Sequence, residues 1–264
     1  MSAGAKPSAV RLSESRCIAI CMNSLKPTPG RNVPSKRTLV IMAKAPRPGV
    51  VKTRLNQSLP GEAVIALYRC LLEDTVRLAT SLSGVEVAAM CRSSDEEELV
   101  ELLGSRIRIV AQTGVGLAAG LNSVFRHFTA DSEREVIAFN SDSPHLSASV
   151  LMSAFEILTR RDLVIGPTND GGYYLVGAKR PHPTLFETDG LGTSSALDRL
   201  LSKAESLRLS TGFTEPFYDI DVAEDLLRLE HELRFAPQKA PQTAAWFSDW
   251  KTTVEHLRQR IGEP

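Results

Sequence analysis

The chain has 264 residues, 42% of them hydrophobic, and its 31 basic residues balance 31 acidic ones. This length is enough for one large α/β domain with a sizeable core. A net charge of zero provides no global field that would draw the protein to nucleic acid or to an anionic membrane. We therefore expect neither of these partners, and any phosphate that the protein binds must be met by local charges.

The N-terminal residues 1–36 mix Ser, Pro, Lys and Arg without a sustained period. This composition predicts a flexible extension outside the fold. No segment approaches the roughly 20 apolar residues of a membrane span. The cysteines, at positions 17, 21, 70 and 91, form neither a disulfide framework nor paired metal knuckles. We therefore expect a cytoplasmic protein.

From Thr38 onward, short apolar runs alternate with amphipathic ones. The predicted strands are 38–42, 85–90, 107–110, 136–140 and 162–166, and the predicted helices are about 61–81, 95–103, 117–129 and 147–160. This alternation predicts a parallel sheet covered by helices on both faces. A last strand is expected near Phe217. A final helix beyond Phe235 would place Trp246 and Trp250 on one face, which is typical of core packing.

The first predicted strand leads into a loop with prolines, a glycine and four cations, Lys44, Arg47, Lys52 and Arg54. Ligands of open α/β sheets bind at the carboxyl ends of the strands, where this loop begins. Guanidinium and ammonium groups that converge there are suited to phosphate oxygens. The loop therefore predicts a phosphate site, although an ordinary solvated loop can have the same composition.

Carboxylates follow two other predicted strands. Asp142 comes just after 136–140, where it could hold a Mg²⁺ ion, or Mn²⁺ in its place, that bridges phosphates. Its alternative role is that of a turn residue ahead of Pro144. Asp219 and Asp221 lie two residues apart, so both can face the same side of a strand and either can be a second ligand. Asp221 also fits the cap of the helix that follows.

Two glycine-containing segments could hold a second, anionic molecule. Asp170-Gly171-Gly172 has the composition of a tight turn, but it also lets the backbone approach a ligand closely. Thr193 and Ser194 precede a helical run, where amides and hydroxyls could bind an anion or simply cap the helix. We assign the acceptor site to these five residues. The five histidines match no metal or triad pattern and receive no catalytic role.

Several motifs in order resemble those of a bacterial family with the glycosyltransferase-A (GT-A) fold, whose members are often labelled glycosyltransferases or selenodomain-associated transferases. The resemblance is carried by Met42-Ala43-Lys44-Ala45-Pro46, Lys52-Thr53-Arg54-Leu55, Ser141-Asp142-Ser143-Pro144, Gly166-Pro167 and Asp170-Gly171-Gly172-Tyr173-Tyr174. It implies a three-layer α/β/α fold with a mostly parallel sheet, like that of nucleotide-diphospho-sugar transferases. The resemblance covers about Leu39 to Leu229. We expect a GT-A-like, nucleotide-binding transferase domain at 37–235, with 236–264 as a helical extension packed on it.

The chain is also similar to the phospholactate guanylyltransferases at Lys52-Thr53-Arg54-Leu55, at Asp219-Ile220-Asp221 and at Gly120-Leu121-Asn122. We assign catalytic roles to Lys44, Lys52 and Arg54, because phosphoryl chemistry needs the growing negative charge to be neutralised. We expect a metal held by Asp142 with Asp219 or Asp221. The implied nucleotide-binding residues are Ala43, Lys44, Lys52, Arg54, Gly120 and Asn122.

Three functions are compatible with these residues. The favoured one is magnesium-dependent nucleotidyl transfer from a nucleoside triphosphate to a small phosphate- or carboxylate-bearing acceptor, with release of pyrophosphate. The second is glycosyl transfer from a nucleotide-diphospho-sugar, in which the same metal would bridge the leaving diphosphate. The third is a nucleotide-binding module without catalysis, because a fold does not by itself imply a function.

Overall fold

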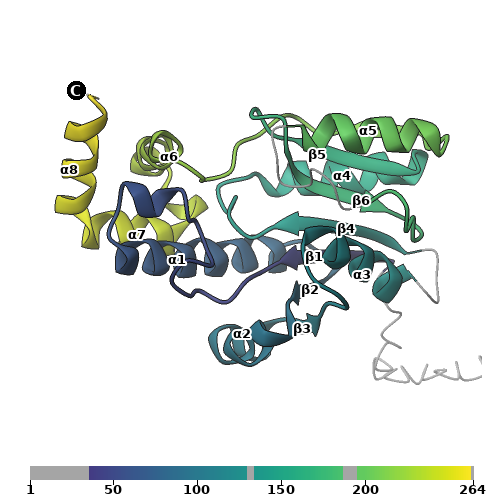
Figure 1. Cartoon of the computed structure of the whole chain (residues 1–264), viewed down its shortest axis with the longest axis horizontal. Helices are drawn as coiled ribbons and strands as arrows, with labels where there is room; N and C mark the ends of the chain where they lie inside the picture. The colour runs from purple at the N-terminus through teal and green to yellow at the C-terminus, as the bar shows by residue number, and fades with distance from the viewer. Residues whose placement is uncertain (1–35, 130–133, 187–194, 263–264) are drawn as a thin grey trace, which may run out of the picture. The chain divides into compact units, whose positions relative to one another are not determined.

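A computed structural model of the chain describes residues 36–129, 134–186 and 195–262. Its centre is a seven-stranded sheet in the order β3-β2-β1-β4-β6-β5-β7 (Figure 1). The strands are β1 Arg37–Met42, β2 Val85–Cys91, β3 Arg108–Ala111, β4 Glu135–Asn140, β5 Leu163–Pro167, β6 Tyr173–Ala178 and β7 Thr211–Phe213. Only β6 runs against its neighbours, β4 and β5, and the other pairings are parallel. The predicted α/β fold with a mostly parallel sheet is confirmed.

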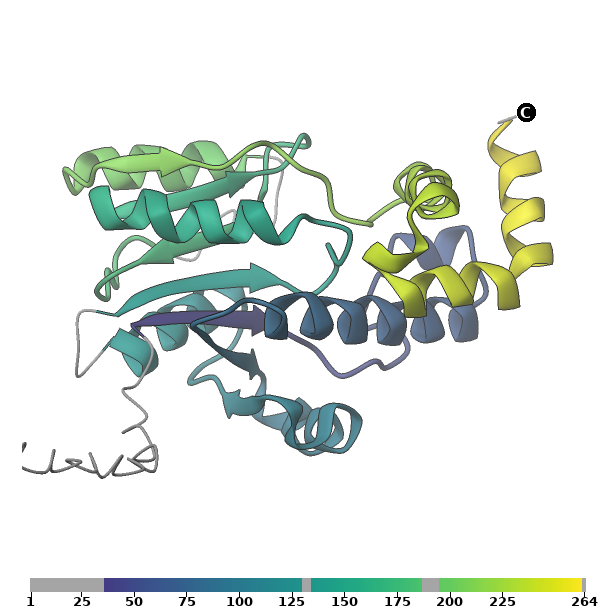
Figure 2. The same cartoon turned by 180° about the vertical axis from the view of Figure 1, so that it is seen from behind.

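Helices cover both faces of this sheet. The helices are α1 Gly61–Thr80, α2 Glu96–Leu103, α3 Leu117–Thr129, α4 Ala148–Arg160, α5 Ala196–Ser206, α6 Ala223–Phe235, α7 Pro241–Asp249 and α8 Lys251–Ile261. One core cluster joins the sheet to α1, α2 and α4, and a second joins its other face to α3 and α5. Figures 1 and 2 show these two helical layers from opposite sides.

The buried position of β1 explains its uninterrupted apolar sequence. Leu39, Val40 and Ile41 are all fully buried, because successive side chains point to opposite faces and both faces are covered. Leu39 and Ile41 belong to the first core cluster, whereas Val40 belongs to the second. Strands of this kind have no polar face, and this feature made β1, β2 and β4 recognisable in the sequence.

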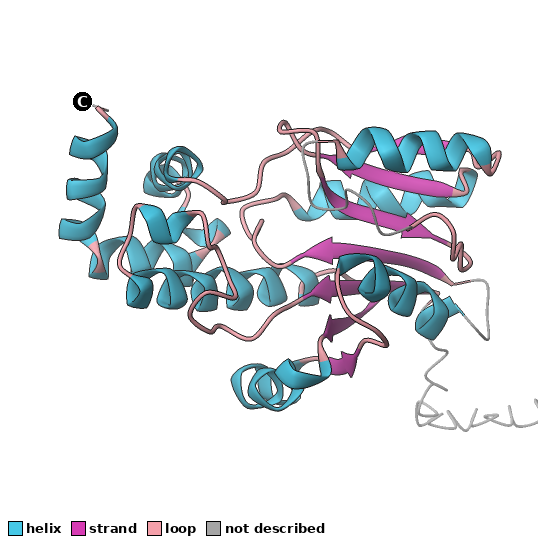
Figure 3. Cartoon of the chain, in the orientation of Figure 1, coloured by secondary structure: helices cyan, strands magenta, loops and turns pink. Residues whose placement is uncertain are grey.

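Helix α1 extends beyond the sheet and packs on the C-terminal helices as well (Figure 3). Tyr68 and Leu72 face the sheet, while Leu67 and Leu71 belong to a third core cluster shared with α6, α7 and α8. The Trp246 indole donates a hydrogen bond to the Ala63 carbonyl oxygen at 3.1 Å. No helix in the described ranges is long and apolar enough to cross a membrane.

Three local predictions differ from the structure. Strand β6, which begins at Tyr173 and forms a hairpin with β5, is not among the predicted strands. Phe217 makes only an isolated bridge to Thr168, and the edge strand lies earlier, at β7. The predicted final helix is two helices that meet at Trp250. The core-packing interpretation of the tryptophans is nevertheless confirmed, because Trp246 is buried and its ring stacks on that of Trp250. Apart from Lys36, the predicted N-terminal extension lies outside the described residues.

Candidate functional site

The carboxyl ends of the three central strands form one edge. Met42 of β1 is paired in register with Met90 of β2 and with Asn140 of β4. All three residues line a cavity of about 630 Å³. The loop after β1 and the loop after β4, which carry the predicted cations and Asp142, leave the sheet at this edge. The cavity therefore lies where ligands of open α/β sheets bind.

Lys52 lies at the centre of the charged part of this cavity. Its side chain is 3% exposed and its ammonium group donates hydrogen bonds to Asp142 and to Asp221, the latter at 3.0 Å. Burial by itself would lower the pKa of Lys52, but the two carboxylates more than offset it and raise that pKa above its usual value. Lys52 also has a φ of +46°, in the left-handed region that non-glycine residues rarely adopt. The fold thus holds this cation in a constrained position.

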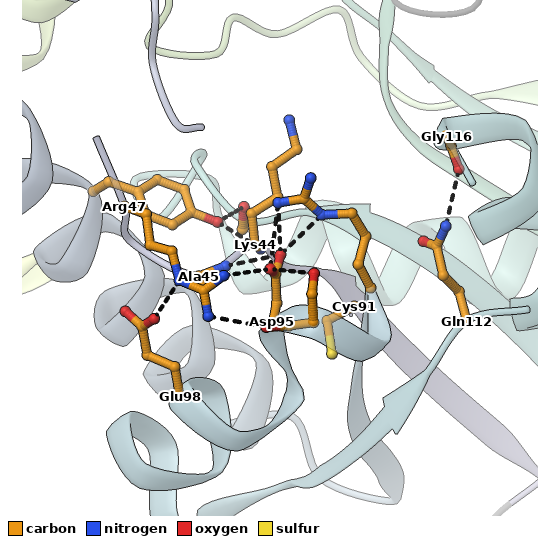
Figure 4. A network of polar contacts seen from close by, with 12 residues as sticks. Lys44, Ala45, Arg47, Cys91, Asp95, Glu98, Gln112 and Gly116 are labelled. Carbon is orange, nitrogen blue, oxygen red and sulfur yellow. Dashed lines mark hydrogen bonds and ion pairs between the residues drawn. The ribbon is translucent and has the colours of Figure 1, made fainter. Parts of the chain in front are cut away.

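The other predicted cations divide into two groups. Lys44 and Arg54 line the cavity, and an Arg54 Nη1 lies 3.5 Å from an Asp221 oxygen. Within the described ranges, no acid pairs with the Lys44 side chain, which extends away from the polar network in Figure 4. The predicted convergence is wrong for Arg47, whose guanidinium binds Glu98 at 2.7 Å and Asp95 at 3.4 Å. Arg47 therefore stabilises the outer part of the loop and is not one of the cavity cations.

The loops that carry these groups are tied together by Tyr68 of α1. Its buried hydroxyl accepts a hydrogen bond from the Lys44 backbone N–H at 3.1 Å and pairs with the Ser141 hydroxyl at 3.0 Å. Burial raises the pKa of Tyr68 to about 12, so the phenol stays protonated at neutral pH. A helix that packs on the sheet therefore sets the distance between the basic loop and the Asp142 loop.

Asp142 and Asp221 have the chemistry to hold a divalent cation together with a phosphorylated ligand. Asp142 uses one oxygen for Lys52, and its Oδ1 is buried without a hydrogen-bond partner among the described residues. Such an orphaned oxygen is suited to a metal or to a ligand donor. Asp221 lies across Lys52 from it. The described residues contain no cluster of three or more metal-binding side chains, but Mg²⁺ needs only one or two carboxylates when phosphates supply further oxygens.

The alternatives left open for Asp219 and Asp221 are partly separated by the structure. Asp221 lines the cavity, whereas Asp219 is half-buried and does not line it. Burial and the nearby Asp142 and Asp221 carboxylates raise the pKa of Asp219 to about 7. The capping role considered for Asp221 belongs to Asp225, whose carboxylate accepts hydrogen bonds from the backbone N–H groups of Asp221 and Val222. The Asp221 side chain is therefore directed to the cavity by a cap that another acid supplies.

The opposite part of the cavity is more apolar. Met42, Met90 and the 91%-exposed Val115 line it, together with Gln112 after β3. The Gln112 amide donates hydrogen bonds to the carbonyl oxygens of Gly114 and Gly116, at 3.1 and 3.2 Å, and so holds the exposed loop. A flat, largely apolar ring system with a few polar groups at its edge, such as a nucleobase, would suit this part of the cavity.

The remaining predicted site residues lie in other positions. Ala43 lines the cavity, but Gly120 and Asn122 do not. Gly120 lies beneath the lining: a Cβ there would come within 2.7 Å of the Gln112 side chain and 2.9 Å of that of Met42. Asp170 caps a turn by accepting hydrogen bonds from the Thr168 hydroxyl and the Gly172 N–H, and Gly171 has a φ of +88°. This turn does not line the cavity, and Thr193 and Ser194 lie outside the described residues.

The fold is shared with solved structures of nucleotide-using transferases. A crystal structure from Desulfovibrio desulfuricans, described as a nucleotide-diphospho-sugar transferase, matches with a TM-score of 0.76 at 24% identity, over 84% of this chain and 98% of the other. The 4-diphosphocytidyl-2C-methyl-D-erythritol synthase of Anaerococcus prevotii matches with a TM-score of 0.52 at 15% identity, over 76% of this chain and 98% of the other.

Sequence comparison is more specific over part of the chain. Residues 75–193 match the model of a family described as an uncharacterized protein conserved in bacteria, DUF2064. The 2-phospho-L-lactate guanylyltransferase of Methanocaldococcus jannaschii is 26% identical over 130 residues, which are 49% of this chain and 54% of that protein. The chain thus matches about half the length of this curated relative. These matches confirm the predicted resemblance to GT-A-like proteins and to the phospholactate guanylyltransferases.

Proposed function

We propose that the protein is a magnesium-dependent transferase that moves a nucleotidyl group from a nucleoside triphosphate to a small anionic acceptor. The observation that carries this proposal is Lys52, a buried ammonium held between Asp142 and Asp221 in a cavity that Lys44 also lines. Cations and paired carboxylates at one strand edge are the arrangement that phosphoryl chemistry requires. The half-length similarity to a guanylyltransferase supports the same reaction type.

The proposed reaction needs no base on the protein. A phosphate or carboxylate oxygen of the acceptor attacks the α-phosphorus of the triphosphate and forms a new P–O bond. The bond from the α-phosphorus to its bridging oxygen breaks, and pyrophosphate leaves with the electron pair. Because such an acceptor is already ionised at neutral pH, no proton has to be removed. Catalysis then consists of alignment and of neutralising charge on the phosphate oxygens.

Lys44, Lys52 and Arg54 provide that neutralisation from the chain itself. Lys52 is the most constrained of the three, because it is buried and held by two carboxylates. Asp142 and Asp221 would hold the metal, with Asp219 behind them. When bound, Mg²⁺ or Mn²⁺ would neutralise and orient the phosphates. The base of the nucleotide would lie against Met42, Met90 and Val115, over the helix turn that contains Gly120 and Asn122.

The acceptor site is proposed at Asp170, Gly171 and Gly172 and at the Thr193-Ser194 segment. Backbone amides at a glycine turn and the hydroxyls of Thr193 and Ser194 are donors suited to an anion, and Asp170 would orient a hydroxyl group of the acceptor. Glycosyl transfer from a nucleotide-diphospho-sugar remains the second candidate. It is favoured by the Asp170-Gly171-Gly172-Tyr173-Tyr174 segment, which follows the bacterial GT-A-fold family and not the guanylyltransferases.

The released product distinguishes the candidates. The protein is incubated with magnesium, a metabolite extract and each nucleoside triphosphate or nucleotide-diphospho-sugar in turn. Nucleotidyl transfer releases pyrophosphate from one triphosphate, and glycosyl transfer releases a nucleoside diphosphate from a sugar nucleotide. Release of a nucleoside diphosphate alone contradicts the favoured function. Tight nucleotide binding without turnover of any donor supports the non-catalytic module instead.

A further inference from the structure

Arg92 is a cavity residue that none of the sequence motifs includes. It follows β2 directly and lines the cavity with Lys44 and Lys52. We propose that Arg92 is a further phosphate-binding residue of this site and that the buried Asp95 positions it. This inference rests on the proposed function, because it assigns Arg92 to the same triphosphate.

The guanidinium of Arg92 is held by one edge. Its Nε and Nη2 donate hydrogen bonds to the Asp95 carboxylate at 3.1 and 3.0 Å, with a longer one of 3.3 Å from Nη2 to the second oxygen. An arginine has five N–H donors in a rigid plane. The bonds to Asp95 use Nε and Nη2 only, so the two N–H groups of Nη1 take no part in them. A planar group that is fixed on one edge presents its other edge in a defined direction, which reduces the entropy lost when a phosphate binds.

Asp95 is a fully buried carboxylate, and such a group is rare unless it is paired. Its side chain is 0% exposed. Besides Arg92, it accepts hydrogen bonds from the backbone N–H of Ala45 at 3.2 Å and from the Ser94 hydroxyl at 3.1 Å. Figure 4 shows that these bonds meet at a single carboxylate. The same group therefore fixes the start of the basic loop and the guanidinium of Arg92, which form two walls of the cavity.

The position of Arg92 differs from that of Arg47 in one respect that decides its role. Both arginines pair with Asp95, and their side chains are 43% and 40% exposed. Arg47 has a second acid, Glu98, and does not line the cavity. Arg92 lines the cavity with Lys44, whose ammonium forms no salt bridge with an acid in the described ranges. The two arginines thus share a structural partner, but only Arg92 can reach a ligand.

This difference provides a matched test with inorganic pyrophosphate as the probe. Its affinity is measured by calorimetry in the presence of magnesium for the wild-type protein, Arg92→Gln and Arg47→Gln. One lost charge-assisted hydrogen-bonding group corresponds to about a 10–100-fold rise in Kd, which we expect for Arg92→Gln. We expect Arg47→Gln to stay within about twofold of the wild type. Thermal unfolding of each variant reports on the shared Asp95 network.

The controls separate this inference from the proposed function. Equal binding by the wild type and both variants, or an equal loss in both, overturns the assignment of Arg92 and leaves the function intact. If the wild-type protein binds neither pyrophosphate nor any nucleoside triphosphate, the proposed function itself fails. Arg92→Lys serves where Arg92→Gln does not fold: it keeps the charge but loses the planar fork, so a several-fold weaker affinity supports the inference and wild-type affinity contradicts it.

Discussion

Replacing Lys52 with alanine removes the buried cation at the centre of the proposed site. A preorganised group of this kind contributes about 3–4 kcal/mol to transition-state stabilisation, so turnover should fall by about two to three orders of magnitude. The same change leaves two acids without their shared partner. Breaking a fully buried ion pair costs about 3–5 kcal/mol, but Asp142 and Asp221 are 18% and 35% exposed. We therefore expect roughly half of that cost, about 2 kcal/mol of unfolding free energy.

The two effects are measured separately, by turnover at saturating triphosphate and by urea unfolding. Lys52→Gly is the matched control, because it also lacks the ammonium group but tolerates the left-handed backbone. It should be about 1 kcal/mol more stable than Lys52→Ala and equally impaired in turnover. The reasoning is refuted if either folded variant keeps turnover near the wild-type level. A glycine variant that restores turnover would show that backbone conformation, and not the ammonium, carries the effect.

Three other changes test separate parts of the account. His145 is 2% exposed, and burial lowers its pKa to about 3. Because the unfolded chain binds this proton below about pH 6.5, the unfolding free energy of the wild type should fall as the pH decreases. Measured by urea unfolding between pH 7 and pH 5, His145→Phe should lose about 2 kcal/mol less unfolding free energy than the wild type. Asp142→Asn should abolish the effect of a chelator on nucleotide affinity; equal wild-type affinity with and without magnesium would contradict this. Asp74 is fully buried and accepts hydrogen bonds from the backbone N–H groups of Gln242 and Thr243 at the start of α7, so Asp74→Ala should lower the unfolding free energy by about 1–3 kcal/mol, and unchanged stability would argue against this role.

The central strands could be predicted from the sequence because burial on both faces requires a continuous run of apolar residues. β1 and β4 are apolar on both faces, and the bounds of α3 agree with the predicted 117–129. β6 was missed because Gly171 and Gly172 are residue types typical of a loop. In the structure they form the turn that lets the following strand pair antiparallel with β5. That pairing is a long-range property of the sheet, and no local pattern encodes it.

In the candidate site, too, locally encoded features could be predicted and long-range contacts could not. Asp142 and Lys52 were found because each follows a strand with unusual residue types, and Arg92 was available by the same rule, since it directly follows β2. Arg47 was misplaced because its partner, Asp95, is 48 residues away in the sequence. Charge alone does not say which of several cations in a loop will meet a ligand and which will meet a distant acid.

The fate of the α-phosphate tests the central claim most directly. A nucleoside triphosphate selected by thermal shift with magnesium is supplied in two labelled forms, one at the α- and one at the γ-phosphate, with the acceptor that supports turnover. The account predicts that the α-label appears in the acceptor product and the γ-label in pyrophosphate, and that Lys52→Ala slows both together. Recovery of the α-label in a nucleoside diphosphate, or the transfer of only a sugar from a sugar nucleotide, would contradict it.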